Sequence, residues 1–367
     1  MILHLLTDDK FADYAIKQYS SLEKRSNFVL VPSNSALHLV KEIDKCAIVY
    51  PDSPEFSNLV NDLSQYTGVI FHGLFWGSWQ KLILESMPRN VKVGWYFWGG
   101  EIYSRHELDT FFMATITRAI YNFRQFFKRR KVDISWEIPL ELFNRIDYCL
   151  TSIPEECDYA KQFTRASFEH LWYTCYSLEE TVGSLMTCRS EGNNVMLGNS
   201  AAIKNNHFDL IWKFITSGSL KTLRKNKVII PLSYGDGWVR NLMLKIGRFL
   251  FGNRMQYLQS YMPLKEYNSL MLTCSTMILG YIQPAGQGNI ITALWLGMRV
   301  YLFEDCIAYK YFKRIGAHVF SIESDLKKYK FTSLSDEERT ENRRVLSMWY
   351  SKENVMNAVQ NVVNTLQ

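Results

Sequence analysis

The chain has 367 residues, of which 47% are apolar, enough to fill two domain cores of ordinary size. Its formal net charge of +6 implies anionic partners only weakly, and seven scattered cysteines without a Cys-x-x-Cys pair argue against a disulfide framework and structural zinc. No charged-then-apolar leader opens the chain, and the longest uncharged apolar run, 270–282, is shorter than the roughly 20 residues that span a bilayer. We therefore expect a soluble chain that begins in the cytoplasm.

Short β-rich runs alternate with amphipathic segments in the first half of the chain. This alternation predicts a parallel sheet flanked by helices. The expected strands cover residues 2–6, 28–31, 47–50, 68–72, 92–97 and 146–150.

The same alternation restarts after a polar stretch at 177–194, which predicts a second open α/β sheet. Its expected strands cover residues 194–197, 227–232, 255–259, 277–281, 300–303 and 318–321. Valines at helical spacing predict a last helix over 351–367. We expect a first domain over 1–185, a second over 190–350, and the final helix after it.

Three loops rich in glycine and serine each follow a predicted strand of the second half: GNSA at 198–201, PLSYGDGW at 231–238 and QPAGQGN at 283–289. Ligands of open α/β sheets lie at the carboxyl ends of the strands, where free amides and helix N-termini attract phosphate. Any one loop alone is as well explained as an ordinary turn. None is a Walker loop or a GxGxxG fingerprint, so we expect no NAD, no ATP and no other cofactor.

A candidate general base follows the strand VKVGWYFW, in the run WGGEIY. Two glycines turn the chain there, and Glu101 would emerge at the rim of the first sheet, where aromatic neighbours could raise its pKa. The alternative is a glutamate that caps a helix N-terminus. Asp8, Asp9 and His72 hold equivalent strand-end positions and are the reserve candidates.

The segment 111–131, FFMATITRAIYNFRQFFKRRK, has six basic residues and no acidic one. Its apolar side chains share one helical face, which is typical of a helix lying on an anionic membrane surface. An equally good interpretation packs this face into the first domain and leaves the charges solvated.

These motifs carry a resemblance. The run PLKEY, then GQGN and ALWLG before a strand, resembles the nucleotide-sugar half of GT-B glycosyltransferases. With LGNSA, NNH, VIIPLSYG and MPLKEY, the chain is similar to the TDP-N-acetylfucosamine:lipid II N-acetylfucosaminyltransferases, also called 4-alpha-L-fucosyltransferases, of bacterial surface polysaccharide synthesis. The likeness is densest over 194–303 and thinner before it, where WGGEIY, FHGLF and KFADYAI carry it.

The resemblance implies a GT-B fold, in which two Rossmann-like domains face each other across a cleft, the first binding the acceptor and the second the donor. It also implies that the final helix, 351–367, returns to the first domain. It implies a hexosyltransferase that moves a 6-deoxy amino sugar from a TDP-sugar donor to a polyprenyl-diphosphate-linked glycan, as in O-antigen or enterobacterial common antigen synthesis. Such an enzyme would be peripheral on the cytoplasmic face of the bacterial inner membrane, here through 111–131. By the same likeness, Glu266 or Tyr267 would contact the nucleoside, and the diphosphate would be held by Gly198, Asn199, Ser200, Ser233, Tyr234, Gly288 and Asn289.

The chain departs from the common retaining pattern, because Ala285 and Ala293 stand where that pattern has a Glu-x7-Glu pair. A missing ribose-binding carboxylate suits a deoxyribose nucleotide and leaves the stereochemical outcome open. No Asp-x-Asp triplet occurs, so we expect no essential metal ion, with Arg240 as the first choice of phosphate-facing cation ahead of Lys204 and Lys310.

Other functions remain open from the sequence. They are a nucleotide-sugar epimerase of similar architecture and a non-catalytic, membrane-associated polysaccharide assembly protein. Nucleic-acid binding ranks last, because the basic residues form no recognisable fold signature.

Overall fold

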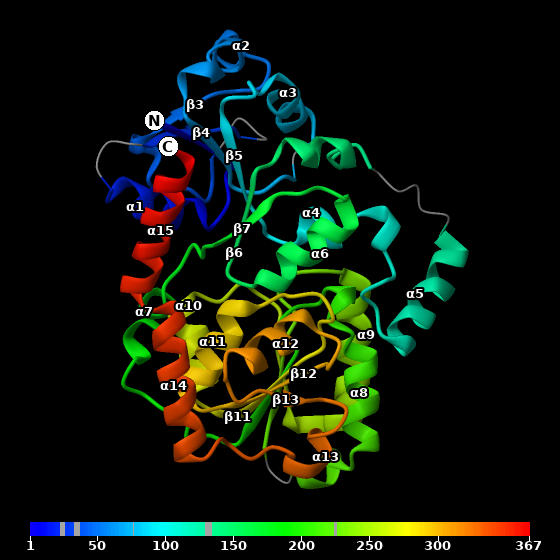
Figure 1. Ribbon diagram of the computed structural model, residues 1–367. Helices are drawn as coiled ribbons and strands as arrows, with labels where there is room; N and C mark the ends of the chain where they lie inside the picture. The colour runs from blue at the N-terminus through cyan, green and yellow to red at the C-terminus, as the bar shows by residue number, and fades with distance from the viewer. Residues whose placement is uncertain (23–25, 33–36, 76, 129–133, 224–225) are drawn as a thin grey trace. The chain divides into compact units, whose positions relative to one another are not determined.

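The computed structural model describes residues 1–22, 26–32, 37–75, 77–128, 134–223 and 226–367 (Figure 1). Two units divide the chain. Unit 1 consists of Met1–Asp109, Val132–Ser177 and Lys352–Gln367, and unit 2 of Thr110–Lys131 and Leu178–Ser351. No helix among the described residues is long and apolar enough to cross a membrane.

Unit 1 is built on a seven-stranded, all-parallel sheet in the order β3-β2-β1-β4-β5-β6-β7. The order reverses between β1 and β4, so their carboxyl ends flank the crevice where open sheets bind ligands. The strands are β1 (Ile2–Leu6), β2 (Ser26–Leu30), β3 (Cys46–Ile48), β4 (Gly68–Phe71), β5 (Lys92–Tyr96), β6 (Tyr148–Thr151) and β7 (Glu169–Trp172). All six strands expected in this half are confirmed within a few residues. Strand β7, whose sequence EHLW has no alternating pattern, was not expected.

The helices of unit 1 cover this sheet and include the end of the chain. They are α1 (Ala12–Ser20), α2 (Pro54–Asn61), α3 (Ser78–Ser86), α4 (Gly100–Tyr103), α6 (Pro154–Thr164) and α15 (Lys352–Leu366). Helix α15 lies beside α1 (Figure 1) and buries Val359, Val363 and Leu366 in the same core as Ile2. Its valine spacing produces this buried stripe, because residues three and four apart share a helix face.

Unit 2 has a six-stranded, all-parallel sheet in the order β10-β9-β8-β11-β12-β13. Its strands are β8 (Asn194–Leu197), β9 (Val228–Pro231), β10 (Met255–Leu258), β11 (Cys274–Leu279), β12 (Arg299–Leu302) and β13 (Phe320–Ser321). All six occur within a few residues of the expected positions, although β11 begins three residues earlier than expected and ends at Leu279 rather than Tyr281. The order reverses between β8 and β11, so the loops after these two strands lie at the switch point, the place where open sheets commonly bind ligands.

The helices of unit 2 include one that is buried on every side. Helix α11 is apolar all round, and all residues from Ile290 to Leu296 are buried, with α7 and α14 packed against it. The unit's helices are α5 (Thr115–Lys128), α7 (Leu178–Val182), α8 (His207–Thr216), α9 (Gly237–Phe251), α10 (Leu264–Met271), α11 (Gln287–Leu296), α12 (Ile307–Arg314), α13 (Leu326–Tyr329) and α14 (Asp336–Tyr350).

The observed units differ from the expected domain bounds in two segments. Residues 178–185 belong to unit 2, and so does 110–131, although the chain on both sides of that segment belongs to unit 1. Helix α5 therefore belongs to unit 2, although the segments before and after it belong to unit 1. Within unit 2 it packs mainly on α8.

Candidate functional site

The first of the three glycine-rich loops follows β8 and is locked to the second. Gly198 has φ +72°, and a Cβ on it would collide with the His207 ring, so the turn requires glycine. The Ala201 amide donates to the Tyr234 carbonyl oxygen at 2.7 Å, and the Asp236 amide donates to the Ala201 carbonyl oxygen at 3.1 Å. These two hydrogen bonds join the backbones of the first and second loops.

The third loop meets the first at the N-terminus of α11. Gly286, with φ +67°, precedes α11, and a Cβ on it would lie only 2.6 Å from the Asn199 side-chain nitrogen. Tyr281 joins the loops from the other side: its hydroxyl donates to Asn199 Oδ1 at 2.6 Å and lies 3.0 Å from the Ser200 hydroxyl. All three loops therefore converge at the switch point of the second sheet.

The start of α11 supplies free hydrogen-bond donors at this point. The first backbone bond into the helix runs from the Ile290 amide to the Gly286 oxygen at 3.0 Å, so the Gly288 and Asn289 amides precede the helical ladder. Such amides, together with the positive end of the helix dipole, suit an anion.

Arg240 adds a positive charge in the first turn of α9. Its Nη2 donates to the Ser233 oxygen at 3.2 Å, while its buried Nε has no partner among the described residues. Tyr234 is 58% exposed beside it. The other two expected cations are less well placed: Lys204 lies 5.9 Å from the Phe112 ring, and Lys310 is exposed on α12.

The two nucleoside candidates lie in the first turn of α10. The Tyr267 hydroxyl donates to the Met196 sulfur at 3.2 Å, which brings it to β8 just before the first loop. Glu266 is exposed.

Glu101 lies at the rim of the first sheet, as predicted, but it is almost enclosed. It is 2% exposed, and its Oε1 accepts hydrogen bonds of 3.2–3.3 Å from Leu74 N, Trp95 Nε1 and Trp98 N. Its Oε2 is buried and has no hydrogen-bond partner in the part of the chain that the structure describes. Burial raises the pKa of Glu101 to about 7, because the charged form loses its hydration.

A second buried carboxyl lies near Glu101. Burial raises the pKa of Glu156 to about 8, and the charge of Glu101 adds to this rise. The Thr151 hydroxyl donates to Glu156 Oε2 at 2.8 Å. No sequence pattern indicates this carboxyl pair, because Glu156 lies in the first turn of α6, where an acidic residue is ordinary.

The reserve candidates have structural partners. Asp8 accepts from the backbone amides of His38, Leu39 and Val40 at 2.7–3.0 Å. Desolvation raises the pKa of the Asp8 carboxyl, but these three hydrogen bonds outweigh it and lower the pKa below its usual value. Asp9 caps α1 by accepting from the Phe11 amide at 2.6 Å.

His72 is buried in the sheet. Its Nε2 lies 3.1 Å from His4 Nδ1, and burial lowers its pKa to about 3, so the ring is neutral at physiological pH. The register of β1 and β4 brings the two rings together, since it places Ile70 opposite His4, and His72 follows two residues later, just past the end of β4.

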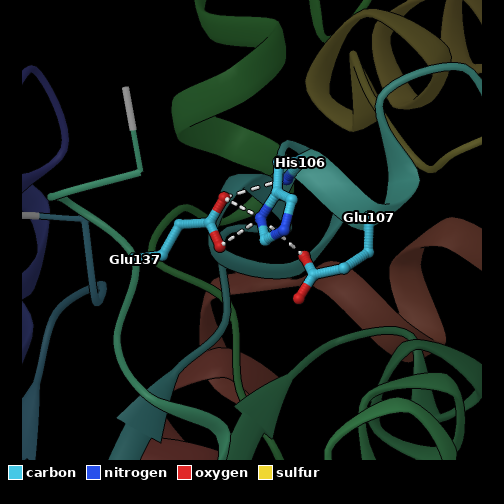
Figure 2. Close-up of side chains that lie close together, drawn as sticks. All are labelled: His106, Glu107 and Glu137. Atoms are coloured by element: carbon cyan, nitrogen blue, oxygen red, sulfur yellow. Dashed lines mark hydrogen bonds and ion pairs between the residues drawn. The ribbon is translucent and has the colours of Figure 1, made fainter. Parts of the chain in front are cut away.

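One further group in unit 1 has the residue types of a metal site. Figure 2 shows the His106 ring between the carboxylates of Glu107 and Glu137, with Nδ1 3.1 Å from an oxygen of each. The Arg105 guanidinium is also within ion-pair distance of both carboxylates, at 3.4 and 3.2 Å. Arg105 therefore already supplies the positive charge that a divalent cation would bring.

Helix α5 has an exposed aromatic face. Phe123, Phe126 and Phe127 are 70%, 81% and 69% exposed. Arg124 lies 4.7 Å over the ring of Trp238, at the start of α9, which fixes the helix next to the second loop. The side chain of Lys128, and Arg129, Arg130 and Lys131, lie outside the described residues.

No protein-family model and no curated protein sequence matches the chain. Solved structures match its fold over the whole chain. Anabaena HepE in complex with UDP has a TM-score of 0.63 at 11% identity, covering 100% of this chain and 99% of that one. A glycosyltransferase from Rickettsia africae has a TM-score of 0.61 at 12% identity, covering 100% and 98%. Sucrose-phosphate synthase from Thermosynechococcus elongatus has a TM-score of 0.58 at 9% identity, also covering 100% and 98%.

These neighbours are GT-B glycosyltransferases, and the two Rossmann-like units have the GT-B fold that the resemblance implies. At such low identity the likeness establishes the fold alone. None of these neighbours bears on the narrower resemblance to N-acetylfucosaminyltransferases.

Proposed function

We propose that the protein is a glycosyltransferase that binds a nucleoside-diphosphate sugar at the switch point of unit 2. The observation that carries this proposal is the convergence of the three glycine-rich loops on the free amides of α11. A diphosphate is the leaving group of sugar transfer, and its developing charge is stabilised by donors that are already in position. Arg240, whose Nε lacks a partner, is the cation we assign to it.

The donor we propose is a TDP-linked 6-deoxy amino sugar of the N-acetylfucosamine type. Support comes from the motifs shared with the N-acetylfucosaminyltransferases and from Ala285 and Ala293, which replace the glutamates of the common retaining pattern. Ala293 is fully buried in α11. At these two places the chain has no carboxylate that could bind the 2′-hydroxyl of a ribose. A deoxyribose nucleotide lacks that hydroxyl and needs no such carboxylate.

The acceptor we propose is a polyprenyl-diphosphate-linked glycan at the cytoplasmic face of the bacterial inner membrane. Three exposed phenylalanines on α5, in a segment with six basic residues and no acidic one, suit an anionic lipid surface. Co-sedimentation with anionic liposomes tests this. The variant Phe123→Ser/Phe126→Ser/Phe127→Ser should lose binding, while Phe249→Ser, which removes an 88% exposed phenylalanine from α9, should keep it. Equal binding by both variants would remove α5 from the proposal.

For the general base we propose Glu101. With a pKa of about 7, a large share of its carboxyl is ionised at neutral pH, and Oε2 is the oxygen left without a partner. The variant Glu101→Gln keeps a carbonyl oxygen for the three donors on Oε1 but cannot accept a proton. Loss of transfer with unchanged donor binding would support the role, and full activity would move it to Asp8, Asp9 or His72. Among these three, the pKa values of Asp8 and His72 are lowered, whereas burial raises the pKa of Asp9.

The decisive experiment is a donor panel of thymidine, uridine and guanosine diphosphate sugars, scored for binding, hydrolysis and transfer. We expect binding and transfer with the thymidine donor. Epimerised sugar without transfer would favour the epimerase, and absence of any nucleotide binding would favour a non-catalytic membrane-associated assembly protein.

A further inference from the structure

Asn206 has an unusual backbone conformation at a fully buried position. It precedes α8 with φ 49° and ψ 38°, the left-handed region, and is 0% exposed. Among the described residues, only Arg165 and Lys330 are other non-glycine residues with positive φ. Asparagine tolerates this conformation better than most residues, and it also provides both an acceptor and two donors.

The Asn206 side chain joins two distant parts of unit 2. Its Oδ1 accepts from the Ala114 amide at 2.7 Å, and its Nδ2 donates to the Phe112 oxygen at 3.2 Å, both at the start of α5. The same Nδ2 donates to the Gly280 oxygen at 2.7 Å. Gly280 directly precedes Tyr281, whose hydroxyl contacts Asn199 and Ser200.

Asp209, one turn later on α8, completes the attachment of α5. Its two carboxylate oxygens accept from the Ile116 amide at 2.9 Å and the Thr117 amide at 2.7 Å. The first turn of α5 is therefore capped by a carboxylate from α8, more than 90 residues away in the sequence.

The residues on either side of Asn206 bind the first loop. Asn205 Nδ2 lies 2.9 Å and His207 Nε2 2.6 Å from the Ser200 carbonyl oxygen. The run Asn205–His207 thus contacts the diphosphate loops through its outer members and the start of α5 through its central one.

We infer that Asn206 is a positioning residue that couples the start of α5 to the donor-binding loops. A nucleotide that fixes the loops then also fixes the start of α5, and by linkage a firmly held α5 tightens nucleotide binding. This inference rests on the proposed function, because it takes the three loops to be the donor site.

Hydrogen exchange with and without saturating thymidine diphosphate tests the coupling. In the unaltered protein we expect the nucleotide to slow exchange several-fold in the peptides covering 286–290 and also 112–117. A peptide covering 335–339, at the start of α14, should not change and serves as the internal control. Protection at 286–290 without protection at 112–117 would overturn the coupling but leave the donor site intact. Protection in neither peptide would overturn both.

Two variants make the test specific. Asn206→Asp keeps an acceptor for the Ala114 amide but loses the Nδ2 donations, including those to the Phe112 and Gly280 oxygens, so the nucleotide should protect 286–290 and no longer 112–117. Equal protection at 112–117 in this variant would overturn the inference. Should Asn206→Asp not fold, Asp209→Asn acts from the α5 side alone: we expect a several-fold weaker affinity for thymidine diphosphate, and an unchanged affinity would count against the coupling.

Discussion

Replacing Gly286 by alanine perturbs the closest approach between the first and third loops. Gly286 has φ +67°, where an L side chain costs roughly 1–2 kcal/mol, and the new Cβ would lie 2.6 Å from Asn199 Nδ2. Asn199 is 6% exposed and held by the Tyr281 hydroxyl, so it can yield only by giving up that hydrogen bond, at about 1 kcal/mol. We expect a total loss in the free energy of unfolding of about 2–3 kcal/mol.

The same change should weaken nucleotide binding. Moving Asn199 or the first turn of α11 withdraws at least one charge-assisted hydrogen bond from the diphosphate, about 1.5–3 kcal/mol, or roughly 10- to 100-fold in Kd. Isothermal titration with thymidine diphosphate measures this, alongside urea unfolding.

Gly218→Ala is the matched control. Gly218 has φ +73° in the same unit, but a Cβ there would meet nothing within 4 Å. It should lose the backbone part of the stability, about 1–2 kcal/mol, and bind thymidine diphosphate normally. Equal nucleotide affinity in the two variants would refute the argument that the loops converge on the diphosphate.

Three further predictions concern single side chains. Tyr281→Phe removes the hydroxyl that contacts both Asn199 and Ser200. The affinity for thymidine diphosphate, measured by titration, should therefore fall about 3- to 10-fold. An unchanged affinity would mean that these hydrogen bonds do not hold the loops in place. Ser335→Ala removes the capping box of α14 and should cost about 1 kcal/mol in urea unfolding, where no loss would contradict the cap. Glu101 has a folded pKa of about 7 against 4.5 for the free group, so the folded state binds the extra proton and stability should fall by about 3 kcal/mol as pH rises from 4.5 to 7. Glu101→Gln should flatten that decline, and an unchanged slope in urea unfolding at pH 5 and pH 7.5 would assign the decline to other groups.

Much of the proposed donor site could be predicted from the sequence because it depends on local signals. Strands β8, β9 and β11 are short, largely apolar runs, each with a glycine or serine within two residues of its end, and parallel strands bring their carboxyl ends to one edge. The role of Tyr281 cannot be read from the sequence, because this residue continues an apolar run that predicts a strand through 281, whereas the strand ends at Leu279.

Long-range features could not be predicted in this way. The amphipathic pattern of α5 indicates a helix but not which unit it packs on, and Asp209, which caps it, is distant in the sequence. The enclosure of His72 depends on the register of β1 against β4, which brings His4 next to it. Strand-end position alone could not separate such a buried residue from one that faces a ligand.

A crystal structure of the complex with thymidine diphosphate tests the central claim most directly. The account predicts diphosphate oxygens within hydrogen-bond distance of the Gly288 and Asn289 amides, with the Arg240 guanidinium turned toward them. A nucleotide bound elsewhere, with the start of α11 empty, would contradict it.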